Sequence, residues 1–398
     1  MHLVLTGASG YLGQHLLSHW ICHGVLPSWH NNNKNNNPAA TAADGVDPGV
    51  KFRITALYHK SEGFPEAVRA FRERHGGNGG GGNGIEDVVV RSVDLADPGD
   101  AVRSVLNDGD GEEEEETIVV HAAAISSPRV CQENPEAARA INVPRKFLDA
   151  VLATTGGPSE STKPPRRRRT SILALSTDQV YDGTQEAGSY YKEDEKEGLK
   201  PKNVYAETKL ELERYLTEQQ EERTGLLVAL RSSIILGPEA PIDPGCAHGT
   251  FLDFCRSRGI SKEPTTFFTN EYRSVVRVDR VIGTIGGLVS KIVVGGGAAA
   301  GSPSAAVVVY NMGGPVRVNR LEMATAVFDR FGYDPEVLLE AEQKSPTSPL
   351  DISMDSSLLV EEGILPPPQD RAPDSAGTYL RDLVDYVFGG GGGGAVTD

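Results

Sequence analysis

Short apolar runs alternate with amphipathic segments along most of the chain. The runs that predict β-strands are His2–Leu5, Phe52–Tyr58, Val88–Val93, Thr117–Ala122, Ser171–Leu175 and Leu227–Leu230. The segments that predict helices are Tyr11–His23, Pro135–Thr154 and Tyr205–Arg223. Strands that are apolar throughout and separated by helices are typical of a parallel sheet with helices on both faces. Because such crossovers are right-handed, we predict an α/β protein with a doubly wound parallel sheet.

Beyond Leu236 the alternation loosens, which predicts a second, smaller unit toward the C-terminus. We expect residues 1–236 to form the main domain, with 275–312 returning to it. Residues 237–274 and 313–388 would then build a smaller C-terminal substrate-binding subdomain, and 389–398 a disordered glycine-rich tail. Six low-complexity tracts are expected to be solvated loops, because they cannot bury enough apolar area to offset chain entropy. They are Trp29–Asp44, Gly76–Gly84, Asp108–Glu116, Gly156–Arg169, Gly295–Ser304 and the tail from Gly389.

Composition narrows the class of protein. The chain has 398 residues, a formal net charge of −16 and a pI near 5.1, which disfavours nucleic acid and anionic membranes as partners. Its four cysteines, Cys22, Cys131, Cys246 and Cys255, form no C-x-x-C pair and are expected to be reduced thiols. No apolar stretch is long enough to span a bilayer. The first strand begins at the initiator methionine, so we expect no leader peptide and a cytoplasmic protein.

A glycine-rich loop, T-G-A-S-G-Y-L-G, joins the first predicted strand to the first predicted helix. Gly7, Gly10 and Gly13 would permit a tight turn, close approach of the backbone to a pyrophosphate, and close packing of helix on strand. The helix N-terminus would face the phosphates. The strand–turn–helix context predicts a Rossmann-type NAD(P)-binding domain, and we include Tyr11 and Leu12 in the cofactor site.

The end of the second predicted strand bears on the choice of cofactor. It reads Leu57-Tyr58-His59-Lys60, with no acidic residue to hold a ribose 2′-hydroxyl. A basic residue suits a 2′-phosphate better, so we predict NADPH rather than NADH, with His59 and Lys60 near the phosphate. The alternative is that Lys60 is a solvated loop lysine.

Later strand ends supply the remaining cofactor candidates. Asp94 would either reach the adenine or cap a helix, and Asn142 would either link a lysine to solvent through water or tie down its own helix. The rest of the predicted cofactor set is Leu95, Ala122, Ala123 and Ala124.

A tyrosine and a lysine stand four residues apart in N-V-Y-A-E-T-K-L. On a helix, Tyr205 and Lys209 lie on one face, about one turn apart. We expect the lysine charge to lower the pKa of the tyrosine, so that the phenol can exchange a proton with a carbonyl or alcohol oxygen. Ser176-Thr177-Asp178 follows the predicted strand Ser171–Leu175, and a hydroxyl at that strand end would hydrogen-bond a substrate carbonyl and orient it for hydride attack.

Three histidines recur at every fourth position of the first predicted helix. His15, His19 and His23 have the spacing of metal ligands, but no cysteine or carboxylate completes a site. We therefore predict an exposed helix face and no metal.

Five strings together resemble the extended short-chain dehydrogenase/reductases, and more narrowly their dTDP-4-dehydrorhamnose reductase-like branch. The strings are L-S-T-D-Q-V-Y-D-G from Leu175, N-V-Y-A-E-T-K-L-E-L-E from Asn203, L-R-S-S-I-I-L-G-P from Leu230, Y-N-M-G-G-P from Tyr310 and P-L-D-I-S-M-D from Pro349. The resemblance implies Thr177, Tyr205 and Lys209 as the catalytic set. It implies Arg273 against a substrate diphosphate, where a structural salt bridge is the alternative, and we add Ser126 and Asp178 to the substrate site.

The same branch includes the regulatory β subunit of methionine adenosyltransferase, which is similar in fold and keeps the Y-x-x-x-K motif. The segment Val119–Glu136 looks more like that subunit than like bacterial reductases, which usually carry an acidic stretch at Pro128–Cys131. Arg280 also stands where relatives tend to have aspartate. Two functions are therefore expected: an NADPH-dependent reductase of a 4-keto-deoxy nucleotide sugar, or a regulator that binds NADP and the catalytic subunit of methionine adenosyltransferase.

Overall fold

The computed structural model of the chain describes most of the protein outside the low-complexity tracts. The described residues are 1–27, 50–75, 84–102, 105, 116–153, 169–220, 225–242, 249–295, 307–366 and 376–389. The six tracts, including the tail, lie outside these ranges apart from single residues at their ends, as does Cys246.

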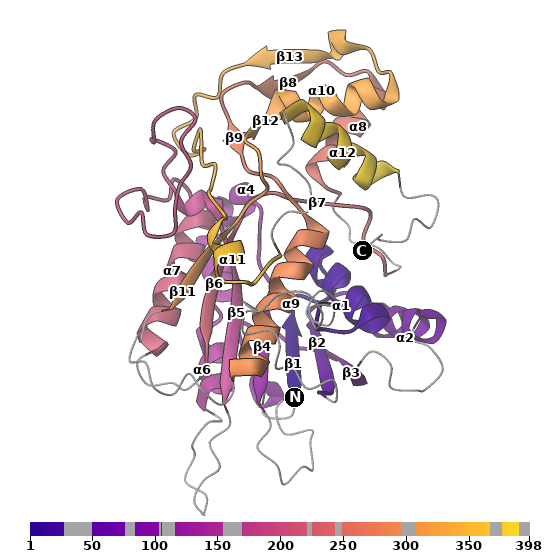
Figure 1. The fold of residues 1–398 in the computed structure, drawn as a ribbon, viewed down its shortest axis with the longest axis vertical. Coiled ribbons are helices and arrows are strands. Elements are labelled where there is room, and N and C mark those ends of the chain that lie inside the picture. Colours follow the sequence, from indigo (N-terminus) through magenta and orange to yellow (C-terminus); the bar gives the residue numbers. More distant parts are fainter. Residues whose placement is uncertain are drawn as a thin grey trace, which may run out of the picture.

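A parallel sheet forms the centre of the molecule (Figure 1). Among the described residues it has seven strands in the order β11-β6-β5-β4-β1-β2-β3, and every neighbouring pair is parallel. The strands are β1 His2–Thr6, β2 Phe52–Tyr58, β3 Ile85–Ser92, β4 Thr117–His121, β5 Thr170–Thr177, β6 Leu227–Ser232 and β11 Val308–Met312. The strand order reverses direction at β1 and β4, so the predicted doubly wound sheet is confirmed.

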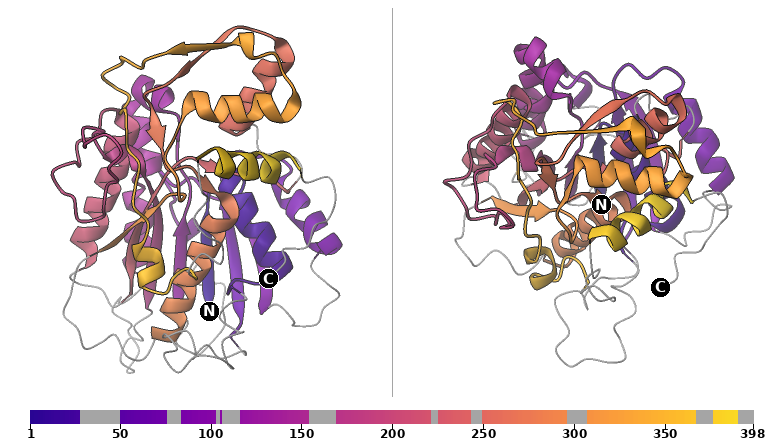
Figure 2. Two further views of the ribbon diagram at one scale, coloured as in Figure 1. Left: turned by 45° about the horizontal axis from the view of Figure 1, so that its top comes forward. Right: turned by 90° about the horizontal axis from the view of Figure 1, so that it is seen from above.

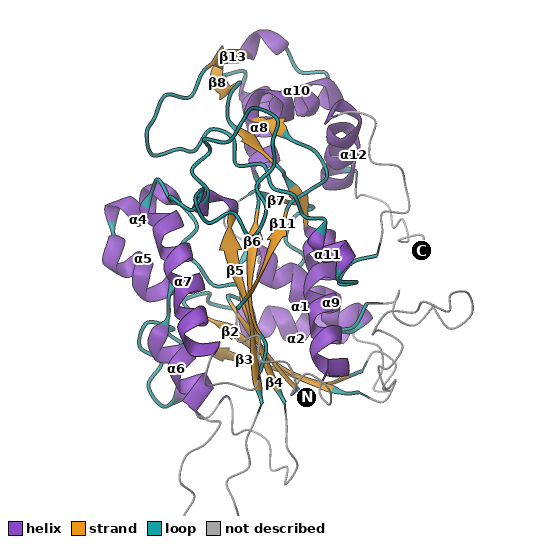
Figure 3. Cartoon of the chain, turned by 60° about the vertical axis from the view of Figure 1, so that its left-hand side comes forward, coloured by secondary structure: helices purple, strands orange, loops and turns teal. Residues whose placement is uncertain are grey.

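Helices cover both faces of the sheet (Figure 3). One face packs against α1 Tyr11–His23, α2 Phe64–His75, α9 Val278–Gly295 and α11 Leu358–Glu361. The other carries α4 Pro128–Glu133, α5 Pro135–Asn142, α6 Arg145–Ala153 and α7 Val204–Gln220. Burial of each helix's apolar stripe against the continuous apolar strands gives two cores, one on either side of the sheet.

The single helix predicted over Pro135–Thr154 is wrong, because the structure has two helices, α5 and α6. The break falls at Val143 and Pro144. A proline has no backbone N–H and disfavours helical geometry in the residue before it, and Val143 accordingly has a non-helical φ of −128° and ψ of 70°. The break places Asn142, the last residue of α5, at a helix end beside β4.

A smaller unit lies beyond the carboxyl ends of the strands, at the top of Figure 1 and of the left view of Figure 2. Its elements are β7 Ile235–Leu236, α8 Phe251–Ser261, β8 Thr265–Phe268, β9 Tyr272–Arg273, β10 Val276–Arg277, β12 Val318–Asn319, α10 Arg320–Phe331, β13 Leu338–Ala341 and α12 Ala376–Phe388. Most of its apolar side chains form a core of their own. Leu359, Ile364 and Leu365 pack instead in the core between the sheet and α1, α2 and α9. The predicted assignment of residues 313–388 to the smaller unit therefore stays a proposal.

Within the described ranges, no helix is both long enough and apolar enough to cross a bilayer.

The burial of Leu173 in the central strand β5 makes a prediction about the free energy of unfolding. Leu173 is fully buried between neighbours on the α1 side of the sheet, whereas Leu339 is 45% exposed. We expect Leu173→Ala to lower the free energy of unfolding by about 3 kcal/mol, because it removes buried methyl groups and leaves a cavity. Urea denaturation measures the loss, and Leu339→Ala is the matched control with a change below about 0.5 kcal/mol. Equal losses would contradict this assignment of the core.

Candidate active site

A cavity of about 260 Å³ opens where β1, β2, β3 and β4 end. Its lining comes from the loops that follow these strands and from α5. The lining residues are Gly7, Ser9, Gly10, Leu57, Tyr58, His59, Val93, Leu95, Ala122, Ala123, Ala124 and Ile141. In doubly wound sheets, ligands bind in the crevice at the carboxyl ends of the strands where the strand order reverses.

The glycine loop turns tightly and packs closely against its neighbours because Gly7 and Gly13 carry no side chain. Gly7 has a φ of +73°, and a Cβ at Gly7 would lie 2.8 Å from the backbone of Ala123. A Cβ at Gly13 would lie 2.1 Å from the carbonyl oxygen of Gly7. Helix α1 begins at Gly10, which offers no side-chain cap, so its N-terminal end is suited to an anionic group such as a pyrophosphate.

Seven of the predicted cofactor residues line the cavity together: Gly7, Gly10, His59, Leu95, Ala122, Ala123 and Ala124. The others lie elsewhere. Tyr11 donates a hydrogen bond of 3.1 Å to the Pro238 carbonyl, and Leu12 packs against the main core. Lys60 is exposed.

Asp94 does not cap a helix, and its contact with the adenine stays a prediction. Its carboxylate is exposed and accepts a hydrogen bond of 3.0 Å from the backbone N–H of Ala96, which closes a turn after β3. Val93 and Leu95 on either side face the cavity instead.

Sequence reasoning missed five cavity residues: Ser9, Leu57, Tyr58, Val93 and Ile141. The first four sit at strand ends or within the glycine loop, so their positions carried a usable signal. Ile141 lies on α5, and only the packing of that helix brings it to the cavity. Ser61 was also missed; its hydroxyl donates to Ser9 at 2.9 Å and ties the loop after β2 to the glycine loop.

The predicted catalytic residues meet at the carboxyl end of β5. Thr177 ends that strand, and Tyr205 and Lys209 lie on α7, which packs against it. Asn203 precedes the helix, and its side-chain oxygen accepts from the N–H of Ala206 at 3.0 Å. The Thr177 hydroxyl lies within hydrogen-bonding reach of the Tyr205 phenol. The Lys209 ammonium is buried and donates to the Leu175 carbonyl at 2.8 Å.

The predicted lowering of the tyrosine pKa is not found. Burial raises the pKa of the Tyr205 phenol above its ordinary value, and the hydrogen bond from Thr177 opposes this only in part. Lys209 is not among the causes of the shift. Burial lowers the pKa of the Lys209 ammonium to about 8, because a buried charge is less stable than a charge in water. Sequence spacing fixed which residues meet, but it gave no measure of how deeply they are buried.

Asn142 is fully engaged by the protein. Its side-chain oxygen accepts from the N–H of Ile125 at 2.7 Å, and its amide donates to the Ile125 carbonyl at 3.2 Å and to the Thr208 hydroxyl at 2.9 Å. These contacts join α5, the segment after β4, and the catalytic helix α7. They favour the second of its two predicted roles, that of tying down its helix.

The three predicted substrate residues differ in exposure. Ser126 is exposed at the end of the segment after β4. Asp178 is buried and accepts from the hydroxyls of Ser233 at 2.7 Å and Thr177 at 3.3 Å. Burial raises the pKa of its carboxyl, and the charge of Arg273 opposes that rise.

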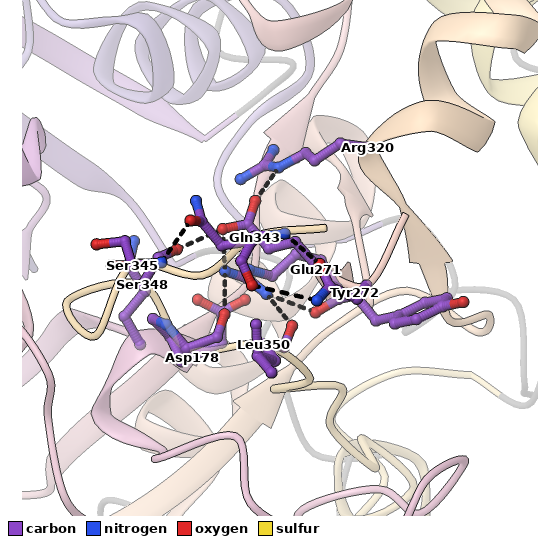
Figure 4. Close-up of polar contacts among 12 residues, drawn as sticks. Asp178, Glu271, Tyr272, Arg320, Gln343, Ser345, Ser348 and Leu350 are labelled. Atoms are coloured by element: carbon purple, nitrogen blue, oxygen red, sulfur yellow. Dashed lines mark hydrogen bonds and ion pairs between the residues drawn. The ribbon is translucent and has the colours of Figure 1, made fainter. Parts of the chain in front are cut away.

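Arg273 is buried in contacts with its own chain. Its guanidinium donates to the carbonyls of Tyr272 at 2.7 Å, Leu350 at 2.9 Å and Pro349 at 3.1 Å. It also lies 3.5 Å from Glu271, whose carboxylate pairs with Arg320 (Figure 4). This geometry matches the structural alternative for Arg273, because these contacts already use its planar fork.

The histidines of α1 do not gather into a metal site. His15 lies 3.1 Å from the Pro238 carbonyl, and the rings of His19 and His23 are 5.0 Å apart. Over the described ranges, no group of three or more histidine, cysteine, aspartate or glutamate side chains is placed to hold a metal ion.

Burial of Lys209 makes a prediction about stability and pH. Its ammonium has a pKa of about 8 in the folded protein and near 10.4 when unfolded, so between these values the unfolded chain binds more protons. The contribution of Lys209 to the free energy of unfolding is therefore lowest below pH 8 and rises above it.

We expect the free energy of unfolding of the wild type, relative to Lys209→Met, to increase by about 2–3 kcal/mol between pH 7 and pH 10. Methionine does not titrate, so the difference isolates the lysine. Urea denaturation of both proteins across this range measures it, and a difference that stays constant with pH would contradict a buried, charged Lys209.

Comparison with known proteins identifies the family. The family model described as the RmlD substrate binding domain matches residues 82–366, more than half of the chain. A search of curated protein sequences finds no match.

Solved structures share the fold. A dTDP-glucose 4,6-dehydratase from Streptomyces venezuelae, with NAD and TYD bound, has a TM-score of 0.64 at 15% identity, covering 97% of this chain and 96% of that one. A UDP-glucose 4-epimerase from Thermus thermophilus, in complex with NAD, has a TM-score of 0.62 at 19% identity, covering 97% and 98%. A dTDP-4-dehydrorhamnose reductase from Bacillus anthracis, in complex with NADP, has a TM-score of 0.54 at 14% identity, covering 97% and 98%.

The likeness to these structures confirms the predicted fold. The chain belongs to the RmlD substrate binding domain family, the branch that its sequence motifs predict.

Proposed function

We propose that the chain is an NADPH-dependent reductase that acts on the 4-keto group of a deoxy nucleotide sugar. The observation that carries the proposal is the meeting of Thr177, Tyr205 and Lys209 at the carboxyl end of β5. This end of the sheet also holds the cavity built by the glycine loop and β4. A hydroxyl, a phenol and a buried ammonium are the groups that carbonyl reduction needs beside a nicotinamide cofactor.

The cofactor would lie along the carboxyl edge of the sheet. Gly7 and Gly10 would face its pyrophosphate, and Ala122, Ala123 and Leu95 would line the adenosine side. When bound, NADPH supplies the hydride that reduces a carbonyl carbon. The reductase from Bacillus anthracis is in complex with NADP, whereas the dehydratase and the epimerase are in complex with NAD, so the preference for NADPH rests on the loop after β2.

The chain's own residues supply the proton and the orientation. Tyr205 is protonated at neutral pH, since the ordinary pKa of a phenol is near 10 and burial raises it further, so it can donate a proton to the carbonyl oxygen. Thr177 beside it would hold that oxygen in line. The Lys209 ammonium would supply a positive charge one helical turn from Tyr205, held in place by the Leu175 carbonyl.

One observation keeps the regulatory function as a second candidate. The guanidinium of Arg273, the residue expected against a substrate diphosphate, is buried against carbonyls of its own chain. A protein that binds NADP without turnover and associates with the catalytic subunit of methionine adenosyltransferase would not need that contact. Co-purification with that subunit, with and without NADPH, tests this function; failure under both conditions would exclude it.

The proposed acid makes the first functional prediction. We expect purified protein to oxidise NADPH in the presence of at least one 4-keto-deoxy nucleotide sugar, and Tyr205→Phe to lower kcat by about 100-fold or more, because phenylalanine has no proton to give. The change should leave the Kd for NADPH nearly unaltered. Tyr190→Phe, at a tyrosine that is 37% exposed on a loop, is the matched control. Unchanged turnover in Tyr205→Phe would overturn the proposed mechanism.

The loop after β2 makes the second functional prediction, which concerns the choice of cofactor. We expect Lys60→Ala to raise the Kd for NADPH by about tenfold and to leave the Kd for NADH within about twofold, because only NADPH carries the 2′-phosphate. Fluorescence titration measures both constants. Lys51→Ala, at another exposed lysine, should change neither. Equal losses for the two cofactors would show that Lys60 does not read the phosphate.

A further inference from the structure

A second ionisable side chain on the catalytic helix is buried one turn beyond Lys209. Glu213 is 5% exposed, and its carboxylate accepts a hydrogen bond of 2.5 Å from the Ser176 hydroxyl. The guanidinium of Arg231, on β6, pairs with it at 2.8 Å through Nη2 and at 3.2 Å and 3.3 Å through Nε. Sequence reasoning gave Glu213 no role.

Lys209 and Glu213 bind consecutive residues of the same strand. The Lys209 ammonium donates to the Leu175 carbonyl, and Glu213 accepts from Ser176. The next residue is Thr177, whose hydroxyl lies beside Tyr205. Lys209 and Glu213, on one face of α7, therefore hold the end of β5 in place. They bind the two residues that precede Thr177, whose hydroxyl is proposed to orient the substrate.

The charged and titratable groups around Lys209 come from three elements. They are His121 on β4, Cys131 on α4, and Tyr205 and Glu213 on α7. Burial lowers the pKa of His121 to about 3 and raises the pKa values of Cys131 and Tyr205, so all three are neutral at pH 7. At pH 7 Glu213 is therefore the anion among these neighbours, and the Cys131 thiol adds a second negative charge beside Lys209 only where it ionises at higher pH.

We propose that Glu213 is a positioning residue for the reaction, which keeps Lys209 protonated and holds the Leu175–Thr177 end of β5 against α7. Its catalytic consequence rests on the proposed reductase function, whereas its effect on Lys209 does not. Glu213 does not reach the reacting atoms; it acts through Lys209 and Ser176. The ion pair with Arg231 keeps the Glu213 carboxylate in place. The Arg231 guanidinium also donates a hydrogen bond of 2.8 Å to the Tyr181 hydroxyl.

A purely structural ion pair is the competing explanation. A buried Glu213–Arg231 pair would stabilise the junction of α7 and β6 at every pH at which both groups are charged. A carboxylate that stabilises the Lys209 ammonium must instead lose that effect as the lysine deprotonates. The pH dependence of the coupling between the two residues therefore separates the explanations.

The test is a double-mutant cycle on the full chain, with unfolding by urea measured from pH 7 to pH 10. Its four proteins are the wild type, Lys209→Met, Glu213→Gln and the double variant. We expect favourable coupling at pH 7 that disappears as Lys209 loses its proton. In the Glu213→Gln background, the stability transition assigned to Lys209 should move to lower pH by about one pH unit. Coupling that is absent, or that stays constant with pH, would overturn the proposal.

The matched control is Glu211→Gln, at a partly exposed glutamate of α7 that faces Arg139 and Arg145. It should leave the Lys209 transition in place. If Glu213→Gln does not fold because Arg231 is left unpaired, Glu213→Gln/Arg231→Met removes the pair as a unit. That protein should still show the transition at lower pH, and an unmoved transition would count against the proposal in the same way.

Activity supplies a separate measurement. If the protein reduces a nucleotide sugar, the alkaline limb of kcat/KM should move to lower pH in Glu213→Gln and stay unchanged in Glu211→Gln. An unmoved limb in an active Glu213→Gln variant would overturn the catalytic part of the proposal. Absence of turnover in the wild type would overturn the reductase function alone, because the stability cycle needs no substrate.

Discussion

The contact between α7 and the carboxyl end of β5 is the constraint on which the proposed chemistry depends. The buried Lys209 is held there by a hydrogen bond from its ammonium to the Leu175 carbonyl. Burial of that charge opposes folding, as the lowered pKa of the ammonium shows. The surrounding structure offsets this cost with the hydrogen bonds of Asn142 and Ser176 and the ion pair of Glu213 and Arg231. The residues that support the site are therefore as buried as the core.

The fold could be predicted from sequence because each central strand is apolar throughout and each glycine stands where a strand meets a helix. Leu3, Leu173 and Val228 repeat one pattern in three strands, and the parallel pairing follows from it. The break between α5 and α6 was not predicted, although Pro144 is a sequence signal for the end of a helix. The smaller C-terminal unit could not be derived in the same way, because its short strands pair across long separations, as β8 and β13 do.

Site residues were predictable where local spacing determines geometry, and not where burial does. The Tyr205–Lys209 spacing and the Gly7–Gly13 loop fix their own neighbours through one helix and one turn. The raised pKa of Tyr205, the engagement of Arg273 by backbone carbonyls and the role of Glu213 arise from segments far apart in the chain. Those effects depend on desolvation, which a residue pattern does not report.

The most direct test of the account is a crystal structure of the protein with NADP. The account predicts the pyrophosphate at the Gly7–Gly10 turn and the nicotinamide ring beside the Tyr205 phenol, with Lys209 still buried beneath. A cofactor that leaves Tyr205 far from the nicotinamide, or that does not occupy the cavity at the carboxyl ends of β1 and β4, would contradict it.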